Sequence, residues 1–250
     1  MEPTPPPAAA ERKEMSFGDH LFEFRSHLIK SVLAVTVCSA GGLFFWKPLL
    51  HVFTGHPLSK MAHPPKLVFT TPTEAFVVNF KLGVFAGLLV AAPFVLYQVW
   101  CFVAPALYLR EKKTIFPVVF VSTLFFVSGV FFGYRYVLPT AFAFLLDYDS
   151  AGLTPMLSIN KYVGFIVQML VGFGAVFELP VFAFVLARMG LITHRTLLKY
   201  LRHAVVVIFI VAAILTPSPD VFSQVMMAGP LLVLYGLSMG VAYLARKKNG

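Results

Sequence analysis

Charged residues are scarce in this sequence and make up only 12% of its 250 residues. An average soluble domain carries about 25% charged residues. Hydrophobic residues account for 58% of the chain, and the mean hydropathy is +0.82. These values exclude an ordinary soluble globular domain and indicate a protein whose natural solvent is lipid.

Cysteine is equally scarce, with Cys38 and Cys101 as the only two, both in or beside apolar runs. Neither belongs to a CxxC pair, so we expect inert packing residues and no metal site. The seven histidines avoid the middle of every long apolar run, which argues against haem held between membrane helices. The chain also has no nucleotide-binding P-loop, no HExxH and no GxSxG paired with a histidine inside a run, so we expect neither an enzyme nor a bound cofactor.

The formal net charge of +9 does not indicate a nucleic-acid-binding protein. Such a protein gathers its basic residues on one folded surface, whereas here they form short clusters between apolar runs. We therefore interpret the clusters as signals of membrane topology and expect no nucleic-acid partner.

Long apolar runs are what the sequence has in abundance. About 20 helical residues cross a hydrocarbon core of about 30 Å. Five runs are long enough to be membrane helices: 29–46, 76–103, 115–138, 162–186 and 221–244. A sixth, 204–215, has only 12 residues, and its length alone does not distinguish a span from a re-entrant or buried segment.

The distribution of basic residues favours six spans. If 204–215 crosses, then 14 of the 20 lysines and arginines fall on one face, as the positive-inside rule requires of a cytoplasmic face. We therefore predict an all-α integral membrane protein with both termini in the cytoplasm. Its parts are a flexible N-terminal tail (1–19), a single six-helix transmembrane domain (20–245) and a basic C-terminal tail (246–250).

Glu178 interrupts an otherwise apolar stretch inside the fourth run. A carboxylate in hydrocarbon is costly, so it must be protonated, paired, or facing water or a partner. One interpretation is a structural glutamic acid bonded to a neighbouring helix, and the other is a functional group. Gln98, near the end of the second run, has the same two interpretations: a contact between helices or a contact with a bound peptide.

Two further acids fall on the predicted cytoplasmic face. The segment HLFEFRSHL (20–28) places Leu21 and Phe24 on one helical face and includes Glu23 and Arg25, and we expect an interfacial helix leading into the first span. The first cytoplasmic loop, FVAPALYLREKK (102–113), has Glu111 as its only acid. Two such carboxylates can receive two guanidinium groups in bidentate pairs, a geometry that lysine does not reproduce.

These segments together resemble the TatC family, the polytopic receptor subunit of the twin-arginine protein translocase. The resemblance covers the chain from about 20 to 235 and rests on segments in a fixed order: HLFEFR, FVAPALYLREKK, FGAVFELPV, LTPSPDVFSQ and PLLVLY. It implies a concave, glove-like bundle of six helices in the cytoplasmic (inner) membrane. It also implies that signal peptides with paired arginines are bound, that single-span TatA- and TatB-type partners join homo- and hetero-oligomers, and that the proton-motive force drives transport of folded proteins.

The resemblance also implies roles for individual residues. The signal-peptide site comprises Glu23, Glu111, Arg25, Leu21, Pro105, Leu107 and Tyr108. Glu178 and Gln98 are the intramembrane polar contacts, and the outer cap with its partner-docking site comprises Thr216, Pro217, Pro219, Asp220 and Gln224. The chain departs from the family pattern at Phe24, His27, Ala106, Ser218 and Gly236, and the last of these removes a second intramembrane acid that many members carry.

Two other functions stay open on the residues alone. The first is a proton-coupled small-molecule transporter with Glu178 as its proton relay, although the runs offer few other polar groups for a pathway. The second is a membrane scaffold in which all the carboxylates are structural.

Overall fold

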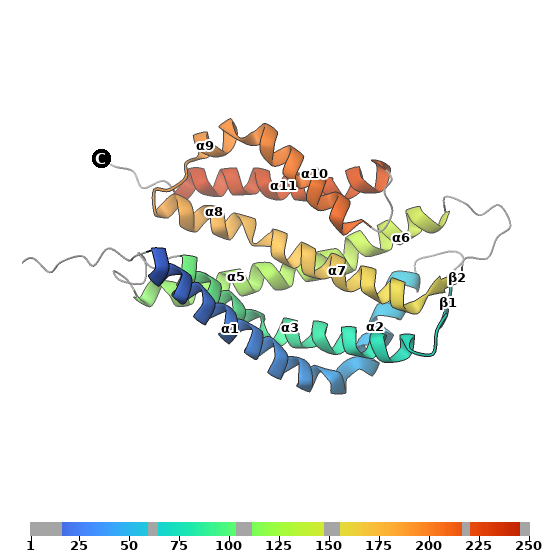
Figure 1. Cartoon of the computed structure of the whole chain (residues 1–250). Helices are drawn as coiled ribbons and strands as arrows, with labels where there is room; N and C mark the ends of the chain where they lie inside the picture. Colours follow the sequence, from blue (N-terminus) through green and yellow to red (C-terminus); the bar gives the residue numbers. More distant parts are fainter. Residues whose placement is uncertain (1–16, 60–64, 104–111, 148–155, 217–220, 246–250) are drawn as a thin grey trace, which may run out of the picture.

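The computed structural model describes residues 17–59, 65–103, 112–147, 156–216 and 221–245. In these ranges the chain is almost entirely helical, and most of the helices run side by side along one long axis (Figure 1). The expected C-terminal tail and residues 1–16 of the expected N-terminal tail lie outside the described residues. The first helix begins at Phe17, before the expected start of the domain at residue 20.

The first half of the described chain contains three long helices. Helix α1 (Phe17–Gly42) passes through a 3₁₀ turn into α2 (Trp46–Ser59), and strand β1 (Lys66–Val68) leads to α3 (Glu74–Val103). Helix α5 (Lys112–Phe132) continues through a π-helical segment (Gly133–Val137) into α6 (Leu138–Asp147).

The second half begins with strand β2 (Met156–Ser158), which pairs in parallel with β1. Five helices follow: α7 (Ile159–Phe177), α8 (Leu179–Arg188), α9 (His194–Lys199), α10 (Leu201–Leu215) and α11 (Val221–Ala245). The sheet lies at the end of the bundle opposite to the start of α1 (Figure 1).

Five helical stretches of the described chain are long and apolar enough to cross a membrane: Leu21–Gly55, Glu74–Val103, Ile115–Phe144, Ile159–Arg188 and Gln224–Ala245. Helix α10, which contains the short run 204–215, has only 15 residues. At about 1.5 Å per residue it is roughly 22 Å long, less than the thickness of a hydrocarbon core. The protein is thus all-helical, with five to six apolar helices.

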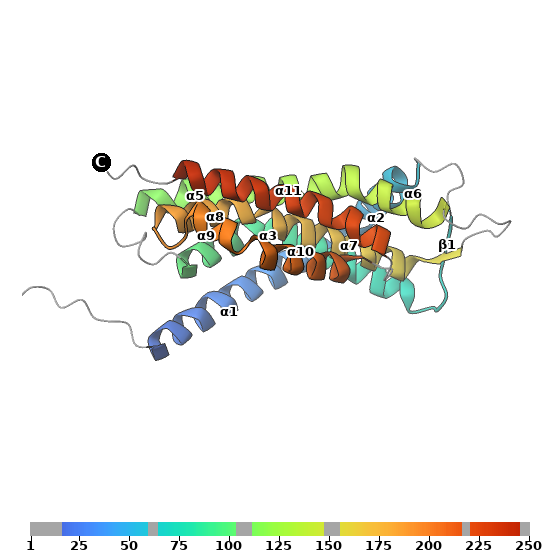
Figure 2. The same cartoon turned by 90° about the horizontal axis from the view of Figure 1, so that it is seen from above.

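Small residues allow α1 and α3 to approach closely. A side chain at Gly87 would collide with the backbone of Ser39, and one at Gly42 would collide with the carbonyl oxygen of Gly83. Two helices without Cβ atoms at their contact can pack backbone against backbone, which is a common way for membrane helices to associate. From this contact the first half of α1 leans away from the bundle (Figure 2).

Helix α7 is the central helix and packs against α3, α5 and α10. Its side chains Val163, Ile166, Met169 and Phe173 are fully buried in the main core. By contrast, the early part of α1 exposes Leu28 and Val32 by about half of their surface. Apolar side chains exposed at this position are expected to face lipid.

At the sheet end, hydrogen bonds join segments that are distant in sequence. The Tyr162 hydroxyl donates to the carbonyl of Phe53 over 2.7 Å, and the Tyr134 hydroxyl donates to that of Val52 over 2.9 Å. Both bonds hold α2 against the bundle. The described parts of the segments that follow the first and the third apolar runs therefore contain α2, α6 and the two-stranded sheet.

Candidate functional site

The start of α1 carries the first predicted site residue, Glu23, which is partly exposed. Its Oε2 atom is shielded from solvent and has no hydrogen-bond partner among the described residues. Arg25 and Leu21 lie exposed on the same helix. The predicted residues Glu111, Pro105, Leu107 and Tyr108 belong to the segment 104–111 between α3 and α5, which lies outside the described residues.

Gln98 joins α3 to the start of α1. This amide is buried, and its Oε1 lies 2.5 Å from Nδ1 of His27. One turn before His27 on α1, the ring of Phe24 packs against that of Phe102 on α3, with the two centroids 5.2 Å apart. Of the two interpretations of Gln98, the structure shows the contact between helices. Its partner His27 was not predicted, although its position four residues after Glu23 puts both on one face of α1.

Glu178 lies at a break between two helices rather than inside a continuous one. Helix α7 ends at Phe177 and α8 begins at Leu179, with Pro180 in its first turn. Proline has no backbone N–H and is favoured at the first positions of a helix, so it fits a new helix start here. The 25-residue run in the sequence is therefore two helices in the structure.

The carboxyl group of Glu178 is enclosed, with only 4% of the residue exposed. Neither carboxylate oxygen has a hydrogen bond of ordinary geometry to a described residue. Ser122 of α5 is the polar side chain that faces it, and the hydroxyl of Ser122 already accepts a 2.7 Å bond from the Trp100 indole. The Trp100 ring in turn lies 4.6 Å from that of Phe182. The result is a carboxyl group held against an aromatic, apolar cluster with almost no polar compensation.

The two glycines before Glu178 contact different helices. A Cβ at Gly174 would meet the ring of Phe126 in α5, and one at Gly172 would meet the side chain of Leu215 in α10. The space beside each glycine is thus already occupied by a side chain of a neighbouring helix.

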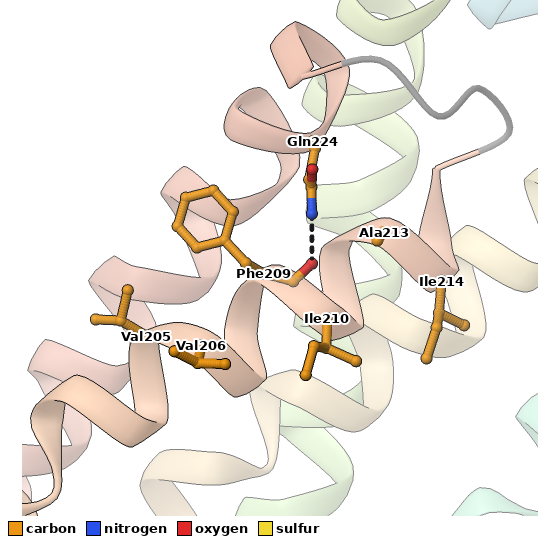
Figure 3. Close-up of a pocket in the computed structure, with 7 residues that line it drawn as sticks. All are labelled: Val205, Val206, Phe209, Ile210, Ala213, Ile214 and Gln224. Atoms are coloured by element: carbon orange, nitrogen blue, oxygen red, sulfur yellow. Dashed lines mark hydrogen bonds between the residues drawn. The ribbon is translucent and has the colours of Figure 1, made fainter.

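A groove along α10 forms the third part of the site (Figure 3). It has a volume of about 490 Å³, and its lining is apolar except for one side chain of α11, Gln224. The Nε2 atom of Gln224 donates a 2.9 Å bond to the carbonyl of Phe209. The α10 residues that line the groove are Val205, Val206, Phe209, Ile210, Ala213 and Ile214.

Thr216 ends α10 near this groove. Its backbone N–H donates to the carbonyl of Ala212 over 2.9 Å, and its hydroxyl donates to that of Ala213 over 3.2 Å. The other predicted cap residues, Pro217, Pro219 and Asp220, lie outside the described residues. No cluster of three or more potential metal ligands occurs in the described part of the chain.

The fold, the start of α1, the buried Glu178 and the groove along α10 define a multi-pass membrane protein. The described residues contain no catalytic constellation. The family profile described as "Sec-independent protein translocase protein (TatC)" matches residues 19–230, and the chain belongs to this TatC family. It is the receptor subunit of a twin-arginine protein translocase, a transporter component rather than an enzyme.

Individual relatives support the same assignment. The chain is 39% identical over 241 residues to the TatC protein of Koribacter versatilis, covering 95% of this chain and 88% of that protein. It is 36% identical over 237 residues to the TatC protein of Aquifex aeolicus, covering 94% of this chain and 98% of the other. A crystal structure of the twin-arginine translocase receptor TatC matches with a TM-score of 0.81 and 37% identity, covering 90% of this chain and 99% of that one.

The family assignment decides between the functions that the residues left open. A TatC protein acts with Tat components and twin-arginine signal peptides, which favours the receptor over a small-molecule transporter.

Proposed function

We propose that this chain is the core receptor and translocase subunit of a twin-arginine system in the cytoplasmic (inner) membrane. Residues 20–245 form one six-helix domain in which α10 is the short sixth span and the helices enclose a concave, glove-like face. Both termini are cytoplasmic, because that orientation collects most of the basic residues on the cytoplasmic side. The sheet end of the bundle then faces outward.

The signal peptide binds at the cytoplasmic end of α1. Glu23 and Glu111 each receive one guanidinium group of the twin arginines, while Arg25, Leu21, Pro105, Leu107 and Tyr108 form the surrounding surface. The observation that carries this assignment is the shielded Oε2 of Glu23, which has no partner among the described residues. A carboxylate in this state gains a strong charge-assisted bond when a guanidinium arrives.

Glu178 serves a later step in the same process. It receives a polar group of a partner helix, or of the signal peptide once that peptide has inserted deeply, with Gln98 and His27 keeping α1 in place beside the path. Its support is the enclosed carboxyl group that lacks a hydrogen-bond partner in the described chain. A group of this kind in a membrane helix marks a functional position.

A single-span partner of the TatA or TatB type docks in the groove along α10. The groove offers a mostly apolar wall with one amide, Gln224, which suits a helix that is apolar apart from a polar group. Thr216, Pro217, Pro219 and Asp220 shape its outer end. Assembly of such partners into hetero-oligomers and homo-oligomers, with the proton-motive force as energy source, completes the proposed mechanism.

The experiment that tests the receptor assignment is peptide binding to the full-length protein in nanodiscs. A twin-arginine signal peptide is compared with its Lys-Lys counterpart on the wild type and on the Glu23→Gln and Glu111→Gln variants. We expect the Lys-Lys peptide and each variant to bind about ten-fold more weakly, because each loses a bidentate, charge-assisted pair.

The matched control is Glu14→Gln, which removes one negative charge from the N-terminal tail and should leave the affinity unchanged. Equal binding of both peptides to all four proteins would contradict the roles of Glu23 and Glu111.

A further inference from the structure

A second cavity lies at the sheet end of the bundle, between α3, α7 and the end of α10. Its volume is about 290 Å³. Its polar lining comprises Lys81 of α3, Asn160, Lys161 and Gln168 of α7, and Thr216, with Gly164 at its wall. None of these except Thr216 belongs to the signal-peptide, intramembrane or docking residues of the proposed function.

The cavity is positively charged. Lys81 Nζ donates to Oδ1 of Asn160 over 2.7 Å, and no carboxylate of the described chain lines the cavity. The negative charge of Glu74 acts on Lys161, but Glu74 does not line the cavity, and its oxygens accept bonds from Thr70 and Ser158. The Thr216 hydroxyl and one N–H of Gln168 already donate to backbone carbonyls. The donors left to bind an anion are therefore the Lys161 amine, the remaining N–H of Lys81 and the side-chain N–H groups of Asn160.

The polar lining extends into the membrane-facing part of α7. Gln168 lies two turns below Asn160, which is about 12 Å along a helix, and its side chain is exposed. Its Nε2 donates a 2.6 Å bond to the carbonyl of Ile214 at the end of α10. Polar groups at this depth require polar partners, because lipid chains offer none.

Below Gln168 the same side of α7 becomes apolar. Lys161, Gln168 and Ala175 are exposed at a spacing of seven residues, so they share one face of the helix, and Leu179 beyond them is 39% exposed. One exposed stripe therefore passes from cationic to polar to apolar over a few helical turns. This order matches the order of groups in a phospholipid, from phosphate to acyl chain.

We propose that this cavity binds the phosphate group of an anionic phospholipid whose acyl chains lie along the exposed stripe of α7. In the orientation proposed above, the lipid belongs to the outer leaflet. It occupies the space left where α10 ends short of the bilayer surface. A free phosphate ion satisfies the amines but leaves the apolar part of the stripe unused, so the lipid is the occupant that fits both parts.

The test is lipid binding to the full-length protein in detergent, measured by native mass spectrometry. Dioleoyl phosphatidylglycerol is titrated into the wild type, into Lys81→Gln/Lys161→Gln and into Lys66→Gln, a control at the same end of the bundle that does not line the cavity. We expect the double variant to lose affinity by roughly five-fold for each lysine removed and the control to keep it.

A third variant distinguishes binding in the cavity from general attraction of the lipid to positive surface charge. In Gly164→Ala the new methyl group would lie 3.0 Å from Lys81 Nζ, so it displaces the amine without changing the charge. Weaker phosphatidylglycerol binding in this variant supports the cavity. Thermal unfolding of each variant establishes that it is folded before its lipid affinity is compared.

Three results would overturn the proposal. The first is wild-type affinity for phosphatidylglycerol in the double-lysine variant. The second is unchanged binding in Gly164→Ala while the double variant loses it, which would indicate charge attraction without the cavity. The third is displacement of bound phosphatidylglycerol by millimolar inorganic phosphate but not by the same concentration of chloride, which would assign the site to a soluble anion.

Discussion

Glu74 and Glu178 are both buried glutamates, with 6% and 4% of their surface exposed, but their surroundings are opposite. Glu74, at the start of α3, accepts bonds from the backbone and hydroxyl of Thr70 and from the hydroxyl of Ser158. Glu178, at the break between α7 and α8, has no hydrogen-bond partner in the described part of the chain. Burial alone therefore does not tell a structural carboxylate from a functional one.

The partners of each carboxylate show what it does for the fold. The bonds of Glu74 tie the segment after β1 to Ser158, the residue that caps the N-terminus of α7. Glu178 has only the Ser122 hydroxyl facing it, without a hydrogen bond of ordinary geometry, so little of the free energy lost on its enclosure is returned. A group retained at such a cost is expected to interact with something that arrives during function.

The largest expected effect on stability is that of Glu74→Ala. This change leaves two donors of Thr70 and one of Ser158 without their acceptor, so we expect the thermal unfolding midpoint in detergent to fall by roughly 5 °C or more. Export by the folded fraction should persist, because Glu74 has no proposed role in peptide binding. A variant with the wild-type midpoint would show that these bonds contribute nothing net.

Glu178→Leu should give the opposite pattern. Replacing an uncompensated buried carboxyl group by an apolar one is expected to raise the unfolding midpoint by about 3 °C, while export of a twin-arginine reporter protein is lost. The two readouts are thermal unfolding and reporter activity outside the cytoplasm. A fall in the midpoint comparable to that of Glu74→Ala would mean that Glu178 has a stabilising partner, and the contrast between the two glutamates would fail.

The smallest effect is expected at Ser122. Ser122→Ala removes the acceptor of the Trp100 indole, so we expect the midpoint to fall by about 2 °C. Because neither oxygen of Glu178 makes a hydrogen bond of ordinary geometry to Ser122, combining this change with Glu178→Gln should give additive shifts. A large departure from additivity would show that Ser122 stabilises the Glu178 carboxyl group. Glu178 would then resemble Glu74 in having a stabilising hydrogen-bond partner.

The helices are the part of the fold that the sequence predicts, because long apolar runs have few alternatives in a membrane. Each of the six expected runs overlaps an apolar helix of the described chain. The break at Glu178 has a visible cause in Pro180, yet proline also occurs inside α3 at Pro93, where the helix continues. The residue type alone therefore does not decide where a helix ends.

The contacts of the site are much harder to predict from sequence. Gln98 meets a residue 71 positions away, Lys81 one 79 positions away, and Ser158 reaches Glu74 across 84 positions. Such pairs depend on how helices are placed side by side, which no local pattern encodes. The close approach of α1 and α3 had a readable signal in Gly83 and Gly87, four residues apart on α3, although it did not identify α1 as the partner.

The close contact at Gly42 also means that a small rotation of α1 there produces a large displacement at the distant N-terminal end of the helix. Glu23 lies 19 residues from Gly42, which corresponds to roughly 28 Å of helix. A rotation of α1 by only about 5° at the contact would move Glu23 by roughly 2.5 Å, close to the length of a hydrogen bond. Small adjustments where the C-terminal end of α1 contacts α3 therefore suffice to make or break a bond near the N-terminal end of α1.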